Sequence, residues 1–190
     1  MQRVIGVECW ADCYFFGRLL NDTKVIRKEK NKDEVLKSII ERSKGGFSIG
    51  IVDRDKGDLS SGFILNKVKV EVEASLELGA YTTVNKLAGK PQFIIELKPK
   101  EFEFWVNEFL RINAKSVIDF GYASVKEFMD ESKSRLELLL TQQRFLAIMD
   151  FIFAEYKGKE EDNHIHKLKR VLAYLIEKNY QADINELINV

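Results

Sequence analysis

The chain is poor in the residues that mark several classes of protein. It has two cysteines, two prolines and two histidines among 190 residues. So few cysteines speak against a disulfide-stapled scaffold, and so few prolines speak against extensive disorder. No run approaches the ~20 apolar residues that a membrane span requires, and the N-terminus shows no basic segment followed by an apolar one. We therefore expect a globular protein of the reducing cytoplasm with no membrane partner.

Net charge is also lacking, since thirty basic residues balance thirty acidic ones. A protein of this kind does not bind polyanions through its overall charge, so any contact with nucleic acid must be local. Lysine-rich stretches at residues 24–32 and 167–170 are the candidates, although such runs are usually solvated surfaces. The hydrophobic content of 45% is enough for a substantial core.

Hydrophobic periodicity predicts an α/β fold. Apolar runs predict strands at residues 3–8, 25–27, 47–52 and 93–97. Apolar residues at helical spacing predict helices at residues 11–20, 33–43 and 101–112. Residues 67–73 alternate with period two, as a half-exposed strand does. Alternating strands and helices with right-handed crossovers imply a parallel sheet, whose ligands lie beyond the carboxyl ends of the strands.

From Ser124 onward the pattern is almost wholly helical, with segments near 124–140, 142–156, 162–178 and 183–189. We expect two units: a three-layer α/β domain over residues 1–121 and a helical C-terminal extension over residues 122–190. Within the first unit, residues 60–90 are expected to form a hairpin or an insertion.

Three acids stand at the ends of predicted strands. Glu8 ends the first apolar run, while Asp53 and Asp55 follow the third and are one residue apart. Parallel strands bring such residues to one sheet edge, and their hard oxygen ligands suit Mg²⁺ or Mn²⁺. Lys56 is the nearest counter-charge in the sequence, and Asp58 closes the same acidic loop. We therefore expect a metal site for phosphate chemistry, although strand-end loops are also often acidic without any site.

Two motifs resemble those of TOPRIM domains, which occur in topoisomerases, bacterial primases and OLD-type nucleases. Val7-Glu8-Cys9-Trp10-Ala11-Asp12, followed by Phe15-Phe16-Gly17-Arg18-Leu19-Leu20, is similar to the first family motif, and Ile51-Val52-Asp53-Arg54-Asp55 to the second. The resemblance spans about residues 3–100 and implies a Rossmann-like TOPRIM fold. The chain departs from the family at Cys9, where a glycine is usual.

The resemblance implies a Mg²⁺- or Mn²⁺-dependent hydrolase that cleaves or transfers phosphodiesters of DNA or RNA, such as a defence-related nuclease component. Glu8 would act as general acid/base or metal ligand, and Asp53 and Asp55 would hold the metal. Asp12 matches an acid often seen in the first motif, and Glu103 is a candidate later ligand. Both also lie in the first turn of a predicted helix, where acids are favourable without any site. OLD-type relatives further imply an ATPase or other protein partner, and the helical tail could mediate oligomer assembly.

Two other interpretations keep the fold and change the function. The chain resembles a response-regulator receiver, with Asp53 as phosphate acceptor and Lys98 after a late strand, although Cys9 and Trp10 replace the usual adjacent acids. Alternatively, it is a non-catalytic module that binds a partner protein, a nucleotide or RNA.

Weaker motifs have simpler interpretations. Cys9 and Cys13, four residues apart, would form half of a zinc site, but buried packing is the expected role. His164 and His166 lack the spacing of a helical zinc pair and are expected to be solvated. Asp119-Phe120-Gly121 matches a kinase metal-binding loop by chance, since the other kinase motifs do not precede it.

Overall fold

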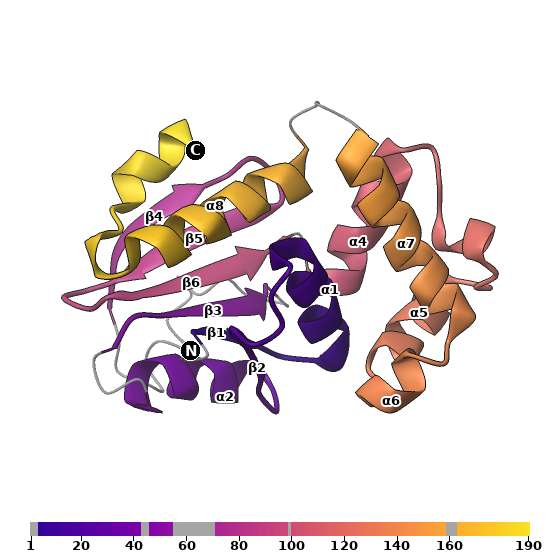
Figure 1. Ribbon diagram of the computed structural model, residues 1–190, viewed down its shortest axis with the longest axis horizontal. Helices are drawn as coiled ribbons and strands as arrows, with labels where there is room; N and C mark the ends of the chain where they lie inside the picture. Colours follow the sequence, from indigo (N-terminus) through magenta and orange to yellow (C-terminus); the bar gives the residue numbers. More distant parts are fainter. Residues whose placement is uncertain (1–3, 43–45, 55–70, 99, 159–162) are drawn as a thin grey trace.

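The computed structural model describes residues 4–42, 46–54, 71–98, 100–158 and 163–190, which form an α/β structure around a six-stranded sheet (Figure 1). The strands are β1 (Ile5–Val7), β2 (Ile26–Lys28), β3 (Ser48–Asp53), β4 (Val72–Glu77), β5 (Thr82–Leu87) and β6 (Gln92–Leu97). The helices are α1 (Trp10–Leu20), α2 (Lys32–Lys37), α4 (Phe102–Ile112), α5 (Val125–Ser132), α6 (Leu136–Leu139), α7 (Gln143–Gly158) and α8 (His164–Lys178). Short turns of other helix types are the π-helical η1 (Ser38–Arg42) and the 3-10 turns η3 (Val117–Phe120), η4 (Asn179–Gln181) and η5 (Ile184–Asn189).

The strand order is β2-β1-β3-β6-β5-β4, and the half from β2 to β6 is parallel as predicted. The other half departs from the predicted parallel sheet, because β5 runs antiparallel to both β4 and β6. Only short turns join these three strands, and a short turn permits an antiparallel pairing where a parallel one needs a long crossover. β4 and β5 form a hairpin within the stretch 60–90, and alternate residues of β4 are exposed. The predicted strand at 67–73 lies largely outside the described residues.

Helices cover both faces of the sheet, which makes three layers. On one face, Val35 and Ile39 pack against Val52 of β3 and Ile94 of β6. The approach is close there: a Cβ added to Gly50 would lie 2.8 Å from the Ile39 Cδ1 atom, so the glycine lets the helix layer approach β3.

The opposite face carries the larger hydrophobic cluster. Side chains of β1, β3 and β6 pack there against α1 and α4, and residues from α5 to η5 belong to the same cluster. The predicted units 1–121 and 122–190 therefore share one hydrophobic core. Figure 1 shows α8 lying along this face, with α5, α6 and α7 gathered at one end of the molecule. Among the described residues, no helix combines the length and apolar character needed to cross a membrane.

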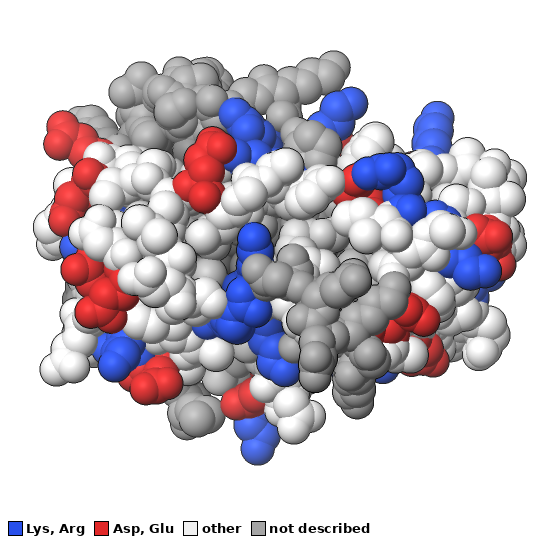
Figure 2. Space-filling view, turned by 90° about the horizontal axis from the view of Figure 1, so that it is seen from above, with Lys and Arg blue, Asp and Glu red and all other residues white. Residues whose placement is uncertain are grey.

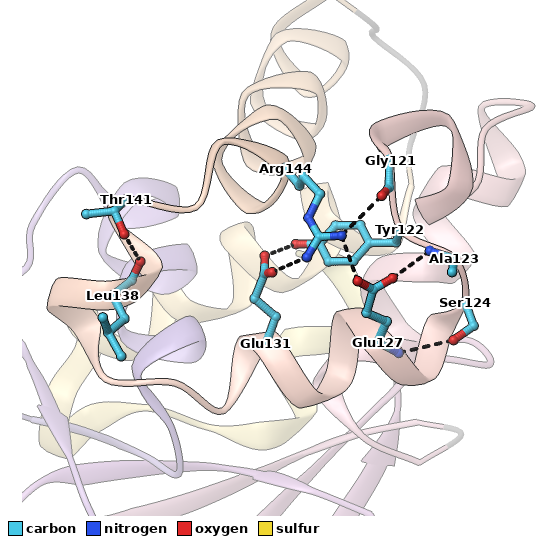
Figure 3. A network of polar contacts seen from close by, with 9 residues as sticks. All are labelled: Gly121, Tyr122, Ala123, Ser124, Glu127, Glu131, Leu138, Thr141 and Arg144. Carbon is cyan, nitrogen blue, oxygen red and sulfur yellow. Dashed lines mark hydrogen bonds and ion pairs between the residues drawn. The ribbon is translucent and has the colours of Figure 1, made fainter.

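An arginine-centred network fastens α5 to α7 (Figure 3). The Arg144 Nη1 atom lies 3.1 Å from the Gly121 carbonyl oxygen and 2.7 Å from Glu127 Oε1, and its Nη2 atom lies 2.5 Å from Glu131 Oε2. The guanidinium also lies over the Tyr122 ring, 4.3 Å from its centroid, and the Tyr122 hydroxyl donates to Glu131. Charge-assisted bonds of this kind fix relative orientation. The network thereby positions the C-terminal end of α5.

His164 is buried, so the expectation that it is solvated is wrong. It is the first residue of α8, and its Nε2 atom lies 3.3 Å from the backbone oxygen of Trp105 in α4. Its ring contacts those of Trp105, Tyr81 and Phe109, with centroid distances of 4.5, 4.7 and 5.9 Å. Burial lowers the pKa of His164 to about 4, so the imidazole that joins α8 to α4 and to the turn between β4 and β5 is neutral at physiological pH.

This burial predicts acid sensitivity. The unfolded chain protonates His164 near pH 6.5 and the folded chain near pH 4, so the contribution of the neutral ring is present above about pH 6.5 and lost as pH falls toward 4. The free energy of unfolding should fall by about 3 kcal/mol from this group, because a pKa difference of one corresponds to about 1.36 kcal/mol. In His164→Gln, which cannot take up the proton, urea unfolding should show a correspondingly smaller fall between about pH 7 and pH 4.5. Equal pH slopes in both proteins would contradict the assignment.

Candidate acidic cleft

Glu8 and Asp53 lie at the carboxyl ends of neighbouring strands. Asp53 is the last residue of β3, and Glu8 directly follows β1. Because β1 and β3 are adjacent and parallel, the two ends meet at the same sheet edge. The Glu8 carboxylate accepts a hydrogen bond from the Asp53 backbone N–H, with 2.8 Å between Oε1 and N. The structure therefore brings these two candidate residues together; Asp55, Lys56 and Asp58 lie outside the described residues.

Asp53 also connects β3 to α4 and α2. Its Oδ1 atom accepts a hydrogen bond of 2.8 Å from the backbone N–H of Phe102, the first residue of α4. A carboxylate is favoured there by the partial positive charge of the helix N-terminus. The Lys32 ammonium donates to the backbone carbonyl oxygens of Asp53 and Arg54. Asp53 is thus held by the first turns of two helices at the edge where β3 ends.

Asp12 lies beneath the same edge as part of a capping box. Cys9 is the N-cap of α1: its Sγ atom accepts from the Asp12 N–H at 3.4 Å, and Asp12 Oδ2 accepts from the Cys9 N–H at 2.9 Å. Cys9 therefore has a structural role as a helix cap. Burial, with repulsion from Asp12, raises the pKa of the Cys9 thiol and keeps it protonated. The other Asp12 oxygen, Oδ1, is buried without a hydrogen-bond partner.

Two further acids reach the site from α4. Glu103, in the first turn of that helix, is only 3% exposed, and it accepts a hydrogen bond from the Ser132 hydroxyl at the end of α5. Glu101, the N-cap residue, makes no side-chain cap bond, and its Oε2 atom is buried without a hydrogen-bond partner. A favourable interaction with the helix N-terminus does not require burial, so the burial of Glu103 is not explained by its position in the helix alone.

Four of these acids border a cleft of about 250 Å³, namely Glu8, Asp53, Glu101 and Glu103. The lining also includes exposed lysines. Lys30 and Asn31 follow the end of β2, and Lys133 follows the end of α5. Lys30 and Asn31 lie within the stretch 24–32 that the sequence offered for nucleic-acid contact, but sequence reasoning did not place them beside the acids, and it missed Lys133. For Lys30 and Asn31 a signal existed, because the end of a third parallel strand reaches the same sheet edge. Lys133 is brought there by tertiary packing and had no local signal.

Burial and mutual repulsion make the cleft electrostatically unfavourable when it is fully ionised. The pKa of Asp53 is raised well above its usual range, first by burial and then by the charges of Asp12, Glu8 and Glu103. Burial also raises the pKa of Asp12 to about 7, with Glu103 adding repulsion, and raises that of Glu103. Carboxylates in this state gain stability from a proton or from a bound cation.

The donor chemistry fits Mg²⁺ better than a softer metal. Oxygen ligands predominate, and Mg²⁺ is commonly held by one or two carboxylates with the rest of its shell made of water and substrate phosphate. Glu8 and Asp53 would provide those carboxylates. No group of three or more histidine, cysteine, aspartate or glutamate side chains is arranged as a complete metal site within the described part of the chain. Asp55 lies outside that part of the chain.

The remaining motifs have structural roles or lie elsewhere. Asp119 closes a capping box with Ser116 at η3, which accounts for the kinase-like triplet without any metal. Lys167 and Arg170 lie on α8, away from the cleft, beside a hollow formed with β4 and η5. In the face shown in Figure 2, basic and acidic side chains are interspersed over the surface.

Comparison with known proteins gives no relatives for this chain. No family model matches it, and no match was found among curated proteins or solved structures.

Proposed function

We propose that the protein is a Mg²⁺- or Mn²⁺-dependent enzyme of the TOPRIM kind that cleaves or transfers phosphodiesters of nucleic acid. The observation that carries the proposal is the contact between Glu8 and the Asp53 N–H at the shared ends of β1 and β3, inside a cleft with raised carboxylate pKa values. Bound there, a divalent cation would supply charge stabilisation for a phosphate and its leaving oxygen.

The chain's own residues would divide the remaining work. Glu8 lies at the cleft surface and can accept or return a proton, while Asp53 is held in place by the Phe102 N–H. The exposed Lys30 and Lys133 would attract the phosphates of a substrate toward the acids. This combination of buried acids and exposed lysines supports a phosphate substrate over a neutral one.

One contact favours this proposal over a receiver-like phosphate acceptor. Lys98, which the receiver interpretation places near the phosphorylated aspartate, has its Nζ atom 2.8 Å from Glu77 Oε1 on β4. A non-catalytic binding module of the same fold remains the competing proposal, and cation binding separates the two.

Calorimetry with Mn²⁺ and Mg²⁺ tests the proposal. We expect the wild type to bind and the Asp53→Asn, Asp55→Asn double variant to lose binding while keeping its circular dichroism and unfolding transition. The matched control is Asp130→Asn, Asp150→Asn, which removes two exposed carboxylates elsewhere. Absence of binding in the wild type would overturn the metalloenzyme proposal in favour of a binding module, as would equal binding in the two double variants.

A further inference from the structure

Another hollow is lined by residues of α1 and β2 and by residues at and just after α6. We call it the aromatic groove; its lining includes Trp10 and Tyr14 from α1, Ile26 and Lys28 from β2, Leu136 from α6 and Leu140, the residue that follows α6. Its volume is about 480 Å³, within the ~300–1,000 Å³ range of small-molecule sites.

The aromatic groove and the acidic cleft are neighbours along two segments of chain. Cys9 lines the cleft and the next residue, Trp10, lines the groove. Lys30 lines the cleft, and Lys28, two residues earlier, lines the groove. Consecutive Cα atoms are about 3.8 Å apart, so the Cα atoms of Glu8 and Trp10 are separated by at most about 7.6 Å. The two linings are therefore close to each other along the backbone.

The chemistry of the groove selects a flat, apolar ligand that carries negative charge. Trp10 is half-buried, and the Lys28 ammonium lies 5.8 Å from the centroid of its ring. Lys28 is the one formally charged residue among the described residues that line the groove. Aliphatic walls and an indole accommodate a planar ring, and the ammonium pairs with an anion attached to that ring. A nucleobase joined to its phosphate has these two properties.

We propose, resting on the proposed function, that the aromatic groove binds an unpaired nucleobase of the substrate, so that the adjoining phosphodiester lies at the acidic cleft. Trp10 stacks with the base, and Lys28 moves from the indole to the phosphate of the same nucleotide. Bases inside a duplex do not offer their faces to such a groove. The substrate is therefore a single-stranded nucleic acid or a free nucleotide, which share this chemistry.

Binding without divalent cation tests this separately from the metal site. We would measure binding by the fluorescence anisotropy of labelled DNA and RNA strands of about ten nucleotides in the presence of EDTA. A duplex of the same length and a mononucleotide would be the competitors. We expect single strands to bind more tightly than the duplex. Trp10→Ala should lower the affinity for single strands by about 5- to 150-fold, which corresponds to the usual free energy of base–aromatic stacking. Trp10→Phe keeps a stacking ring and should retain most of the affinity. Leu138→Ala, an exposed position on α6 outside the lining, is the matched control.

A second reporter protects the test against misfolding of Trp10→Ala. The chain has two tryptophans, and Trp105 is fully buried, so quenching of wild-type fluorescence by an added strand reports on Trp10. Lys28→Gln should weaken binding without altering the fold. A preference for the mononucleotide would assign the groove to free nucleotides. Equal binding of duplex and single strand, or no effect of Trp10→Ala in a folded protein, would overturn the base site even if calorimetry shows a metal at the cleft.

Discussion

Replacing Glu8 with glutamine is expected to lower Mg²⁺-dependent phosphodiester cleavage by about 10²–10⁴-fold, the usual contribution of a positioned acid or base. Glutamine keeps the volume of the side chain and an oxygen that can accept the Asp53 N–H, so the edge between β1 and β3 should stay intact. It removes the negative charge and the capacity to accept a proton. The change therefore separates chemistry from folding.

The assay is cleavage of labelled single- and double-stranded DNA and RNA with and without Mg²⁺. Glu177→Gln, which removes an exposed carboxylate on α8, should retain wild-type activity. If Glu8→Gln and Glu177→Gln are equally active, Glu8 has no part in catalysis. If the wild type cleaves none of these substrates, the enzymatic proposal fails as a whole.

Replacing Asp12 with asparagine is expected to stabilise the protein at about pH 8 in the absence of divalent cations. Burial raises the pKa of Asp12 to about 7 in the folded chain, whereas the unfolded chain releases the proton near pH 3.8. Between these two pH values the folded state binds more protons than the unfolded state. The stabilisation that comes from the protonated Asp12 carboxyl is therefore complete below about pH 4 and is lost as pH rises through 7. Asparagine resembles the neutral form and retains an acceptor for the Cys9 N–H.

At about pH 8 the free energy of unfolding of Asp12→Asn should exceed that of the wild type by roughly 2–4 kcal/mol, since a pKa difference of one corresponds to about 1.36 kcal/mol. Urea unfolding in EDTA at several values between about pH 5 and pH 8 measures it as the difference between wild type and variant. The exposed Asp130→Asn should keep the wild-type profile. Parallel profiles for wild type and Asp12→Asn would show that Asp12 ionises freely in the folded protein.

The parallel half of the sheet could be predicted because its signals are local. Continuous apolar runs mark β1, β3 and β6, and the geometry of parallel strand ends predicts that Glu8 lies near Asp53. In contrast, β5 carries Thr82, Thr83 and Asn85 as buried residues, so its sequence lacks the apolar signature of a buried strand. A cross-strand partner satisfies the Asn85 amide, whose Nδ2 atom lies 3.0 Å from Glu96 Oε1 on β6.

The burial of Glu103 and His164 could not be predicted from the sequence, because residues far away in the chain cover both side chains. Glu103 is covered through Ser132, which is 29 residues away, and His164 through Trp105, which is 59 residues away. The local patterns around both residues are typical of helix N-termini, where charged and polar side chains are usually solvated. The same limit applies to Lys133, which reaches the cleft only because α5 packs beside α4.

The most direct test of the central claim is the position of a Mn²⁺ ion in crystals of the wild-type protein, located by anomalous scattering. We predict a peak at the shared ends of β1 and β3, within about 2.0–2.6 Å of carboxylate oxygens of Glu8 and Asp53, as hard divalent cations require. An ion bound elsewhere, with Glu8 and Asp53 coordinating nothing, would contradict it, as would crystals that bind no Mn²⁺ at saturating concentration.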